Sequence, residues 1–193
     1  MPPVLLALDT ATDRLAAALL APAGRWCVNE AGGAQASARL IPVLTGLLQG
    51  AGLAMPQVQA VAFGQGPGAF TGLRTACAVA QGLAFAHATP VLAIDSLLIV
   101  ADDARDQAAS NGTGADGPWW VAMDARMDEV YAAAYHHGPA GWAVQVAPQL
   151  YTLGALADSW LAAPPQRVAG SAIDAFGDRL PWGGAALWPR CAD

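Results

Sequence analysis

The segment 64–74, GQGPGAFTGLR, carries the residues with the clearest potential for chemistry in this chain. It follows an apolar run that predicts a strand and precedes one that predicts a helix. Glycines at such a junction let backbone amides approach a phosphate at the helix N-terminus. Gly64, Gly66 and Ala69 also match a loose G-x-G-x-x-A dinucleotide pattern, although Pro67 removes one amide from the loop. Three interpretations stay open: a rigid turn that positions the helix, a phosphate contact, and a dinucleotide site.

Acidic residues at the ends of apolar runs form a second candidate group. Asp9 and Asp124 each end such a run, and Asp13 and Asp128 lie four residues further on. An Asp–Thr pair at the end of a first strand holds a metal-bound nucleotide in actin-like and sugar-kinase folds, but Ala11 stands where those turns usually carry glycine. Turn formation and N-capping are the alternative role for all four acids. The candidate nucleotide contacts are therefore Asp9, Thr10, Gly66 and Gly68.

No residue pattern identifies a catalytic group or a metal site. All nine basic residues are arginine, so a Walker A loop, a Schiff-base mechanism and a catalytic lysine are excluded. His87, His136 and His137 lack the spacing of a metal-ligand pair. A G-x-S-x-G nucleophile motif is also missing from the sequence. The expectation is that this chain has neither catalytic residues nor a metal of its own.

Composition narrows the class of protein. The 193 residues are 55% hydrophobic and 12% charged, with a net charge of -6. Disorder is excluded by this hydrophobicity, and the acidic charge disfavours unaided binding to nucleic acid. The apolar runs fall short of the roughly 20 residues that cross a bilayer, and no basic segment precedes the first of them. Cys27, Cys77 and Cys191 form neither a metal pattern nor a disulfide framework, so a cytoplasmic protein is expected.

Hydrophobic periodicity predicts the elements that must position these groups. The N-terminal lobe, 1–104, is expected to contain strands over 4–9, 15–20, 26–29, 58–63 and 90–94, and helices over 37–49, 71–86 and 96–103. The polar, glycine-rich stretch 105–118 predicts a linker. The C-terminal lobe, 119–193, is expected to open on a strand–turn–strand unit over 119–135, followed by a helix over 152–163 and a strand over 167–169.

The two lobes open with similar patterns. Both first strands end in aspartate, and both return strands carry an alanine triplet, Ala16–Ala18 in one and Ala132–Ala134 in the other. One explanation is that hairpins in an alanine-rich chain look alike. The other is an internal duplication, in which each lobe starts with the same hairpin.

The first two predicted helices are more apolar than one small lobe readily covers. Along the helix 37–49, one apolar stripe is formed by Leu40, Ile41, Leu44, Leu47 and Leu48. The helix 71–86 is apolar or small nearly all round, with alanine repeated every fourth residue. A partner surface and complete internal burial are equally compatible with this pattern.

Three motifs together resemble the bacterial TsaB (YeaZ) family. They are LLALDTAT at 5–12, GQGPGAFTGLR at 64–74 with AVAQGLA at 78–84, and MDARMDEVY at 123–131. They occur in the order and spacing of that family, and the resemblance covers nearly the whole chain. It implies an α/β protein with the duplicated actin-like ATPase (ASKHA, ribonuclease H-like) fold in two lobes. That fold is related to the M22 glycoprotease-like proteins.

The resemblance also implies a function. Members of this family take part in making N6-threonylcarbamoyladenosine at position 37 of tRNA. The family member is a non-catalytic subunit that binds the catalytic paralogue TsaD, and the ATPase TsaE joins the complex. ATP or ADP and metal are expected on those partner subunits, with no cofactor intrinsic to this chain. A homodimer is expected in isolation, tRNA is contacted only through the complex, and no membrane is involved.

In this family the first two helices pair with TsaD. The resemblance therefore makes the expected interface residues Leu40, Ile41, Leu44, Leu47, Leu48, Leu73, Arg74, Cys77, Ala80, Gln81 and Ala84. Leu44→Glu or Ala80→Arg is then expected to abolish the complex without unfolding the lobe. Two departures stand out: Ala36 occupies a position that is histidine in many members, and the family usually continues past a point like Asp193, so the second lobe is expected to be incomplete.

The alternative is an autonomous enzyme. It would be a nucleotide hydrolase that uses Asp9, Thr10 and the 64–72 loop, or an M22-like peptidase. The lack of lysine and of metal-binding histidines counts against both.

Overall fold

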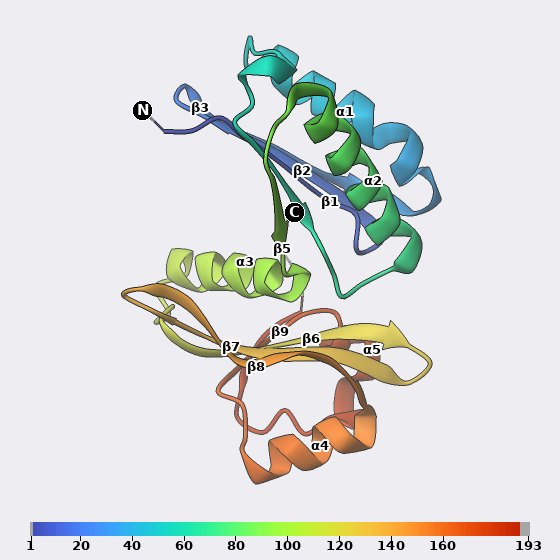
Figure 1. Cartoon of the computed structure of the whole chain (residues 1–193). Helices are drawn as coiled ribbons and strands as arrows, with labels where there is room; N and C mark the ends of the chain where they lie inside the picture. The colour runs from blue at the N-terminus through green and yellow to red at the C-terminus, as the bar shows by residue number, and fades with distance from the viewer. Residues whose placement is uncertain (1, 190–193) are drawn as a thin grey trace. The chain divides into compact units, whose positions relative to one another are not determined.

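The structure, a computed structural model that describes residues 2–189, divides into two compact units between Ser96 and Leu97 (Figure 1). Each unit is built around a five-stranded mixed sheet. The two-lobed α/β class expected from the sequence is therefore confirmed. Among the described residues, none of the helices is both long and apolar enough to cross a membrane.

The first unit has three antiparallel strands followed by two helices that alternate with parallel strands. The order along the chain is β1 (Leu5–Asp9), β2 (Arg14–Ala21), β3 (Gly24–Ala31), α1 (Ala36–Gly50), β4 (Ala60–Gly64), α2 (Phe70–His87) and β5 (Val91–Ile94). The spatial order is β3-β2-β1-β4-β5, with β1, β4 and β5 parallel. Short 3₁₀ turns cover Gly33–Gln35 and Met55–Gln57.

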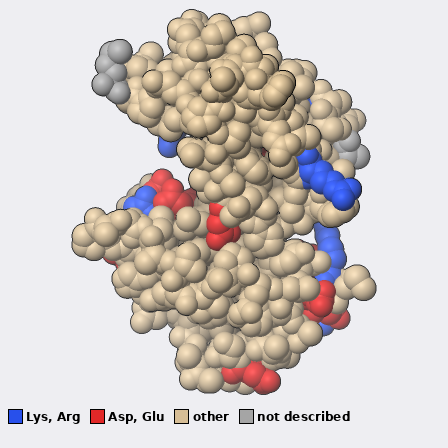
Figure 2. Space-filling view, in the orientation of Figure 1, with Lys and Arg blue, Asp and Glu red and all other residues tan. Residues whose placement is uncertain are grey.

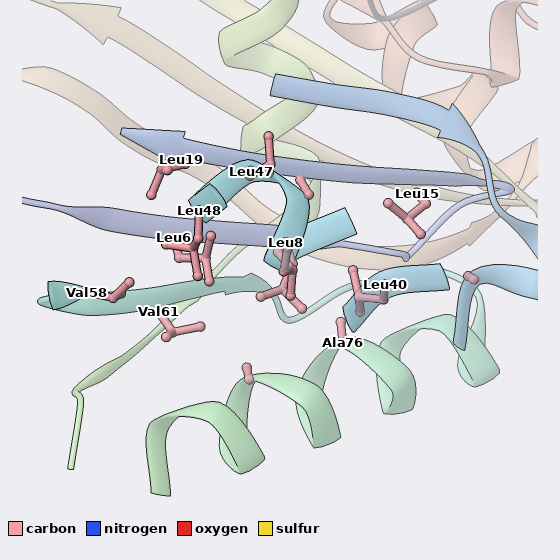
Figure 3. Close-up of a cluster of buried hydrophobic side chains, with 14 residues drawn as sticks. Leu6, Leu8, Leu15, Leu19, Leu40, Leu47, Leu48, Val58, Val61 and Ala76 are labelled. Carbon is pink, nitrogen blue, oxygen red and sulfur yellow. The ribbon is translucent and has the colours of Figure 1, made fainter. Parts of the chain in front are cut away.

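The core of the first unit is built from side chains at alternate positions of its strands. Leu6 and Leu8 of β1 point to the same face of the sheet because successive side chains alternate. Both helices pack on that face, and Figure 3 shows the cluster, to which α1 contributes Leu40, Leu47 and Leu48 and α2 contributes Ala76. The apolar stripe predicted for 37–49 thus covers the unit's own sheet.

The second unit repeats this plan. Its elements are β6 (Gly117–Arg126), β7 (Glu129–Gly138), β8 (Gly141–Thr152), α4 (Leu153–Ala162), β9 (Arg167–Ala169), α5 (Ala172–Phe176), the 3₁₀ turn Gly177–Arg179 and β10 (Ala186–Trp188). The spatial order is β10-β9-β6-β7-β8. Its first three strands are antiparallel, and β6, β9 and β10 are parallel.

The shared topology supports internal duplication over chance resemblance of two hairpins. The first, fourth and fifth strands are parallel in both sheets, and the second and third lie on the other side of the first. The alanine triplets, however, are not equivalent positions. Ala16 lies opposite Asp9, whereas Val130 lies opposite Asp124, so the triplet Ala132–Ala134 is shifted along its strand.

The predicted linker 105–118 is wrong over much of its length. Helix α3 (Ser96–Ser110) continues through its first part, and β6 begins at Gly117. Polar residues after Arg105 suggested a loop, but Ala104 and Ala108 form a buried stripe with Ala101 on the inner side of α3. Packing of that stripe against the sheet of the second unit keeps the polar segment helical.

The tight turn between β6 and β7 has an unusual backbone. Arg126, Met127 and Asp128 all have positive φ, at 68°, 55° and 60°, although none is glycine. This conformation costs an ordinary L-residue roughly 1 kcal/mol, and asparagine tolerates it better. We therefore expect Met127→Asn, at a side chain that is 92% exposed, to stabilise the protein by up to about 1 kcal/mol. Urea unfolding checks this, with Met127→Leu as the unchanged control, and a less stable Met127→Asn variant would contradict it.

Candidate functional site

The candidate nucleotide contacts meet at one edge of the first sheet. β1, β4 and β5 are parallel, so the residues that follow them lie at the same edge. Asp9 ends β1, the loop with Gly66 and Gly68 follows β4, and Ser96 follows β5. The structure thus brings together residues that are far apart in the sequence.

The Asp9 carboxylate is held by two internal hydrogen bonds. The backbone N–H of Ala11 donates to its Oδ1 at 2.5 Å, and the Ser96 hydroxyl donates to its Oδ2 at 3.0 Å. The same Ser96 oxygen accepts the N–H of Gly66 at 3.1 Å. Burial raises the pKa of the Asp9 carboxyl above its ordinary value, and the bonds from Ala11 and Ser96 offset part of that rise.

Ser96 is the functional-site residue that sequence reasoning missed. It links the end of β1 to the glycine loop, because its hydroxyl bonds both Asp9 and Gly66. The available signal was a serine two residues after the predicted strand 90–94. That position lies at the strand's carboxyl end, where polar side chains from neighbouring strands converge.

The glycine loop packs directly on the turn after β1. The Thr10 hydroxyl donates to the carbonyl oxygen of Gly72 at 2.7 Å, and the N–H of Ala69 donates to the carbonyl oxygen of Ala11 at 2.6 Å. A Cβ on Gly68 would lie 2.5 Å from that Ala11 oxygen. Glycine is needed at position 68 because the loop backbone lies directly against the backbone of the turn after β1. This observation favours the rigid-turn interpretation, while the nucleotide contacts stay a prediction.

Replacing Asp9 tests the electrostatics of this edge. A raised folded-state pKa means that the folded protein binds the proton more tightly than the unfolded chain does. The carboxylate therefore lowers stability progressively as pH rises above its ordinary value of 3.8. Asp9→Asn removes this effect, so the variant should gain stability relative to the parent protein as pH rises. Urea unfolding from pH 3 to pH 7 measures the difference.

Asp128 supplies a control of opposite sign. A hydrogen bond and charge from Arg179, whose Nη1 lies 2.9 Å from Oδ1, lower the pKa of Asp128. A lowered pKa means that the Asp128 carboxylate stabilises the folded protein above its ordinary pKa, and this stabilisation is lost on acidification. Asp128→Asn should therefore become less stable relative to the parent protein as pH rises. Identical pH profiles for the two variants would contradict both assignments.

The second unit has a counterpart of the Asp9 turn. The N–H of Arg126 donates to Oδ1 of Asp124 at 2.8 Å, as the N–H of Ala11 does to Asp9. Here the serine bond differs, because the N–H of Asp124 donates to the Ser171 hydroxyl oxygen at 3.1 Å. Each aspartate accepts a hydrogen bond from the backbone N–H two residues further along its own turn. This is the turn-forming role given above as the alternative to nucleotide binding.

The histidines have local settings of other kinds. His137 lies with its Nδ1 2.6 Å from Oδ1 of Asp116 and its ring against Trp142, and His87 ends α2. Within residues 2–189, no group of three or more histidine, cysteine or acidic side chains has the arrangement of a metal site.

Most of the expected interface residues on α1 and α2 are buried in the chain's own core. This is a correction for a set that comprises Leu40, Leu44, Leu47, Leu48, Ala80 and Ala84. They are buried within the first unit, so they are unavailable to a partner. The Leu44→Glu and Ala80→Arg tests would place a charge in that core and cannot isolate an interface. Leu73 and Cys77 are half-buried, whereas Ile41, Arg74 and Gln81 are exposed.

The outer side of the two helices carries exposed apolar residues, of which the sequence singled out Ile41 but not Phe70 or Phe85. Phe85 is 92% exposed and Phe70 is 67% exposed, and Ile41 is 52% exposed. The Arg74 guanidinium lies 3.8 Å from the centre of the Phe70 ring. Charged side chains are sparse on the face of the molecule drawn in Figure 2. We call Ile41, Phe70, Arg74, Gln81 and Phe85 the outer helix face.

Comparison with known proteins gives a consistent result. A family model described as "TsaD: tRNA N6-adenosine threonylcarbamoyltransferase" matches residues 29–166. The "tRNA threonylcarbamoyladenosine biosynthesis protein TsaB" of Haemophilus influenzae is 40% identical over 66% of this chain and 51% of its own length. The protein of the same name in Escherichia coli is 34% identical over 71% of this chain and 57% of its own. The matches thus span little more than half the length of these curated relatives.

Solved structures agree with the fold. "YeaZ from Pseudomonas aeruginosa" is 36% identical, with a TM-score of 0.81 over 96% of this chain and 84% of that chain. A second Pseudomonas aeruginosa structure, described as similar to peptidase YEAZ, has a TM-score of 0.83. Two units of one topology, each with a turn packed at the carboxyl edge of its sheet, define a duplicated actin-like α/β protein. The chain belongs to the TsaB/YeaZ family.

Proposed function

We propose that this chain is a non-catalytic subunit in the biosynthesis of N6-threonylcarbamoyladenosine at position 37 of tRNA. It binds the catalytic paralogue TsaD through α1 and α2 and supports its working state in the cytoplasm. The names of relatives at 34–40% identity support the pathway. The chain works by association, and TsaE completes the assembly.

The observation that carries the binding role is the outer helix face. Large apolar side chains exposed to this degree are characteristic of protein interfaces when they gather on neighbouring elements. Phe85 and Ile41 would each be an apolar anchor that a partner can bury. Arg74 and Gln81 would lie at a polar rim, where charge contributes to specificity. The same face would serve a homodimer when TsaD is missing.

The non-catalytic role rests on how the candidate nucleotide contacts are used. The Thr10 hydroxyl, the Asp9 carboxylate and the Gly66 amide each have a partner inside the first unit. The Thr10 hydroxyl and the Gly66 amide each have one hydrogen to donate, so each must give up or share its internal hydrogen bond before it can bind phosphate. The Asp9 carboxylate is an anion that accepts hydrogen bonds and offers a phosphate no donor. We therefore assign ATP or ADP, metal and threonylcarbamoyl transfer to the partner subunits. The tRNA contacts the complex, in keeping with the net charge of -6 on this chain.

Phe85→Arg tests the proposed interface. The side chain is 92% exposed, so the variant should fold normally and lose at least about tenfold in affinity for TsaD, because a charge replaces an apolar anchor. Calorimetric titration with the TsaD of the source organism measures binding. Threonylcarbamoyl transfer by the reconstituted complex, followed by mass spectrometry of the tRNA nucleosides, measures the functional consequence.

Leu161→Arg is the matched control. Leu161 is an apolar side chain on α4 that is 68% exposed and lies in the other unit. The Leu161→Arg variant should bind TsaD with the affinity of the parent chain. If both variants bind normally, the outer helix face is not the interface. If transfer by TsaD proceeds equally well without this chain, the subunit role itself is wrong.

A further inference from the structure

An arginine near the start of α2 is held in place by an aromatic ring. The Arg74 guanidinium lies 3.8 Å from the centre of the Phe70 ring, and both side chains are exposed. Stacking covers one face of a guanidinium and leaves its N–H donors, which lie in the plane, free to form hydrogen bonds. A long side chain that is already held loses less rotamer freedom when a partner binds it. Phe70 therefore presents Arg74 to a partner in a preorganised position.

The donors of Arg74 have no acceptor in the part of the chain that the structure describes. Residues 2–189 give this side chain its contact with the Phe70 ring, but neither an ion pair nor a hydrogen bond. Other exposed arginines are neutralised within their own unit. These pairs are Arg39 with Glu30, Arg105 with Asp102, Arg126 with Asp124 and Arg179 with Asp128. The charge of Arg74 is thus exposed, positioned and left without a carboxylate.

The two helices of the outer helix face carry no negative charge. Neither α1 nor α2 contains an aspartate or a glutamate, although the whole chain has 15 acidic residues and a net charge of -6. In an isologous dimer the same patch of both copies meets itself. Arg74 would then face α1 and α2 of the second copy, which offer it no carboxylate. Charge complementarity on this face therefore calls for a different protein with an acidic side chain.

We propose that Arg74 determines the partner specificity of the outer helix face by pairing with a side-chain carboxylate of TsaD. This inference rests on the proposed function, which assigns TsaD to that face. TsaD supplies the acid that a second copy lacks, so the face selects TsaD over self-association. A guanidinium and a carboxylate form two parallel hydrogen bonds, which also fix the orientation of the partner. Phe70 acts as a positioning residue, because it holds the guanidinium that makes the pair.

Arg74→Gln tests the pairing, with calorimetric titration of TsaD at low and high ionic strength, about 0.05 M and about 0.5 M. The variant should bind TsaD about tenfold more weakly at low ionic strength, because a charge-assisted pair is lost. Its affinity should also depend much less on salt than that of the parent chain. Self-association, measured by sedimentation equilibrium, should not weaken. Urea unfolding should be unchanged, since Arg74 is exposed.

Arg39→Gln is the matched control. Arg39 is an exposed arginine on α1, but its Nε and Nη2 already donate to the Glu30 carboxylate at 2.7 and 2.9 Å. This variant should match the parent chain in TsaD affinity and in salt dependence. In a Phe70→Leu background, Arg74→Gln should cost only about threefold, because the guanidinium is no longer held in place.

The possible failures are distinguishable. If the parent chain does not bind TsaD, the proposed function is wrong, and this inference is wrong with it. If the parent binds and Arg74→Gln binds with the same affinity and salt dependence, the proposed function stands and the role of Arg74 is wrong. Equal weakening of self-association would make a second copy the source of the carboxylate. Normal TsaD affinity with weaker tRNA binding by the complex would assign Arg74 to a phosphate, and either result would overturn the proposal.

Discussion

Gly72→Ala is expected to destabilise the first unit by about 3 kcal/mol or more, in the range reserved for substitutions that the fold cannot absorb. A Cβ on Gly72 would overlap the carbonyl oxygen of Thr10 and lie 2.8 Å from its carbonyl carbon. Both atoms are backbone, so relief requires α2 and the turn after β1 to move apart. That movement would also break the hydrogen bond from the Thr10 hydroxyl to the Gly72 carbonyl. Chemical unfolding of the variant and parent chains measures the loss.

Gly82→Ala is the matched control, because Gly82 lies in the same helix with nothing within 4 Å of a Cβ. There alanine should stabilise the protein by about 0.5–1 kcal/mol through helix propensity alone. If the two substitutions have effects of the same sign and size, the close packing of the glycine loop on the Thr10 turn is not a feature of the folded chain.

Leu44→Glu is expected to cost about 4 kcal/mol or more and leave little folded first unit, since it removes a core leucine and buries a carboxylate without a partner. Leu44 is 2% exposed, whereas Ile41, one turn earlier on α1, is 52% exposed. Ile41→Glu should therefore leave unfolding nearly unchanged, while it weakens the association with TsaD that we propose. Circular dichroism during urea titration measures the first effect and calorimetric titration the second.

The contrast between these two positions separates a core role from an interface role. Loss of binding with normal folding in Ile41→Glu supports the outer helix face. Normal folding of Leu44→Glu would instead mean that the leucine stripe faces away from the sheet. That result would restore the interface residues that the structure assigns to the core.

Local sequence patterns predicted many of the secondary-structure elements. They failed for segments whose conformation depends on a strand or sheet that is remote in the sequence. The helices at 37–49 and 71–86 match α1 and α2 within a residue or two, because their apolar residues recur at helical spacing. By contrast, no strand was predicted for β8 (Gly141–Thr152), which contains Pro148 and many exposed residues. Pairing along β7 holds it extended despite that composition. The end of α3 was missed for the same kind of reason, since the sheet that stabilises it is remote in sequence.

By itself the sequence determined the periodicity of each helix, the glycines of the 64–74 loop, the repeated Asp-ended strand and the family motifs. Each of these is a property of residues near one another along the chain. The tertiary structure decided which side of each apolar helix is covered, and it turned Leu40 and Leu44 inward while leaving Phe85 outside. It also decided that the loop glycines meet the Thr10–Ala11 backbone and that Ser96 reaches Asp9. Burial and close approach depend on segments that meet only after the sheet has formed, so local sequence carries no record of them.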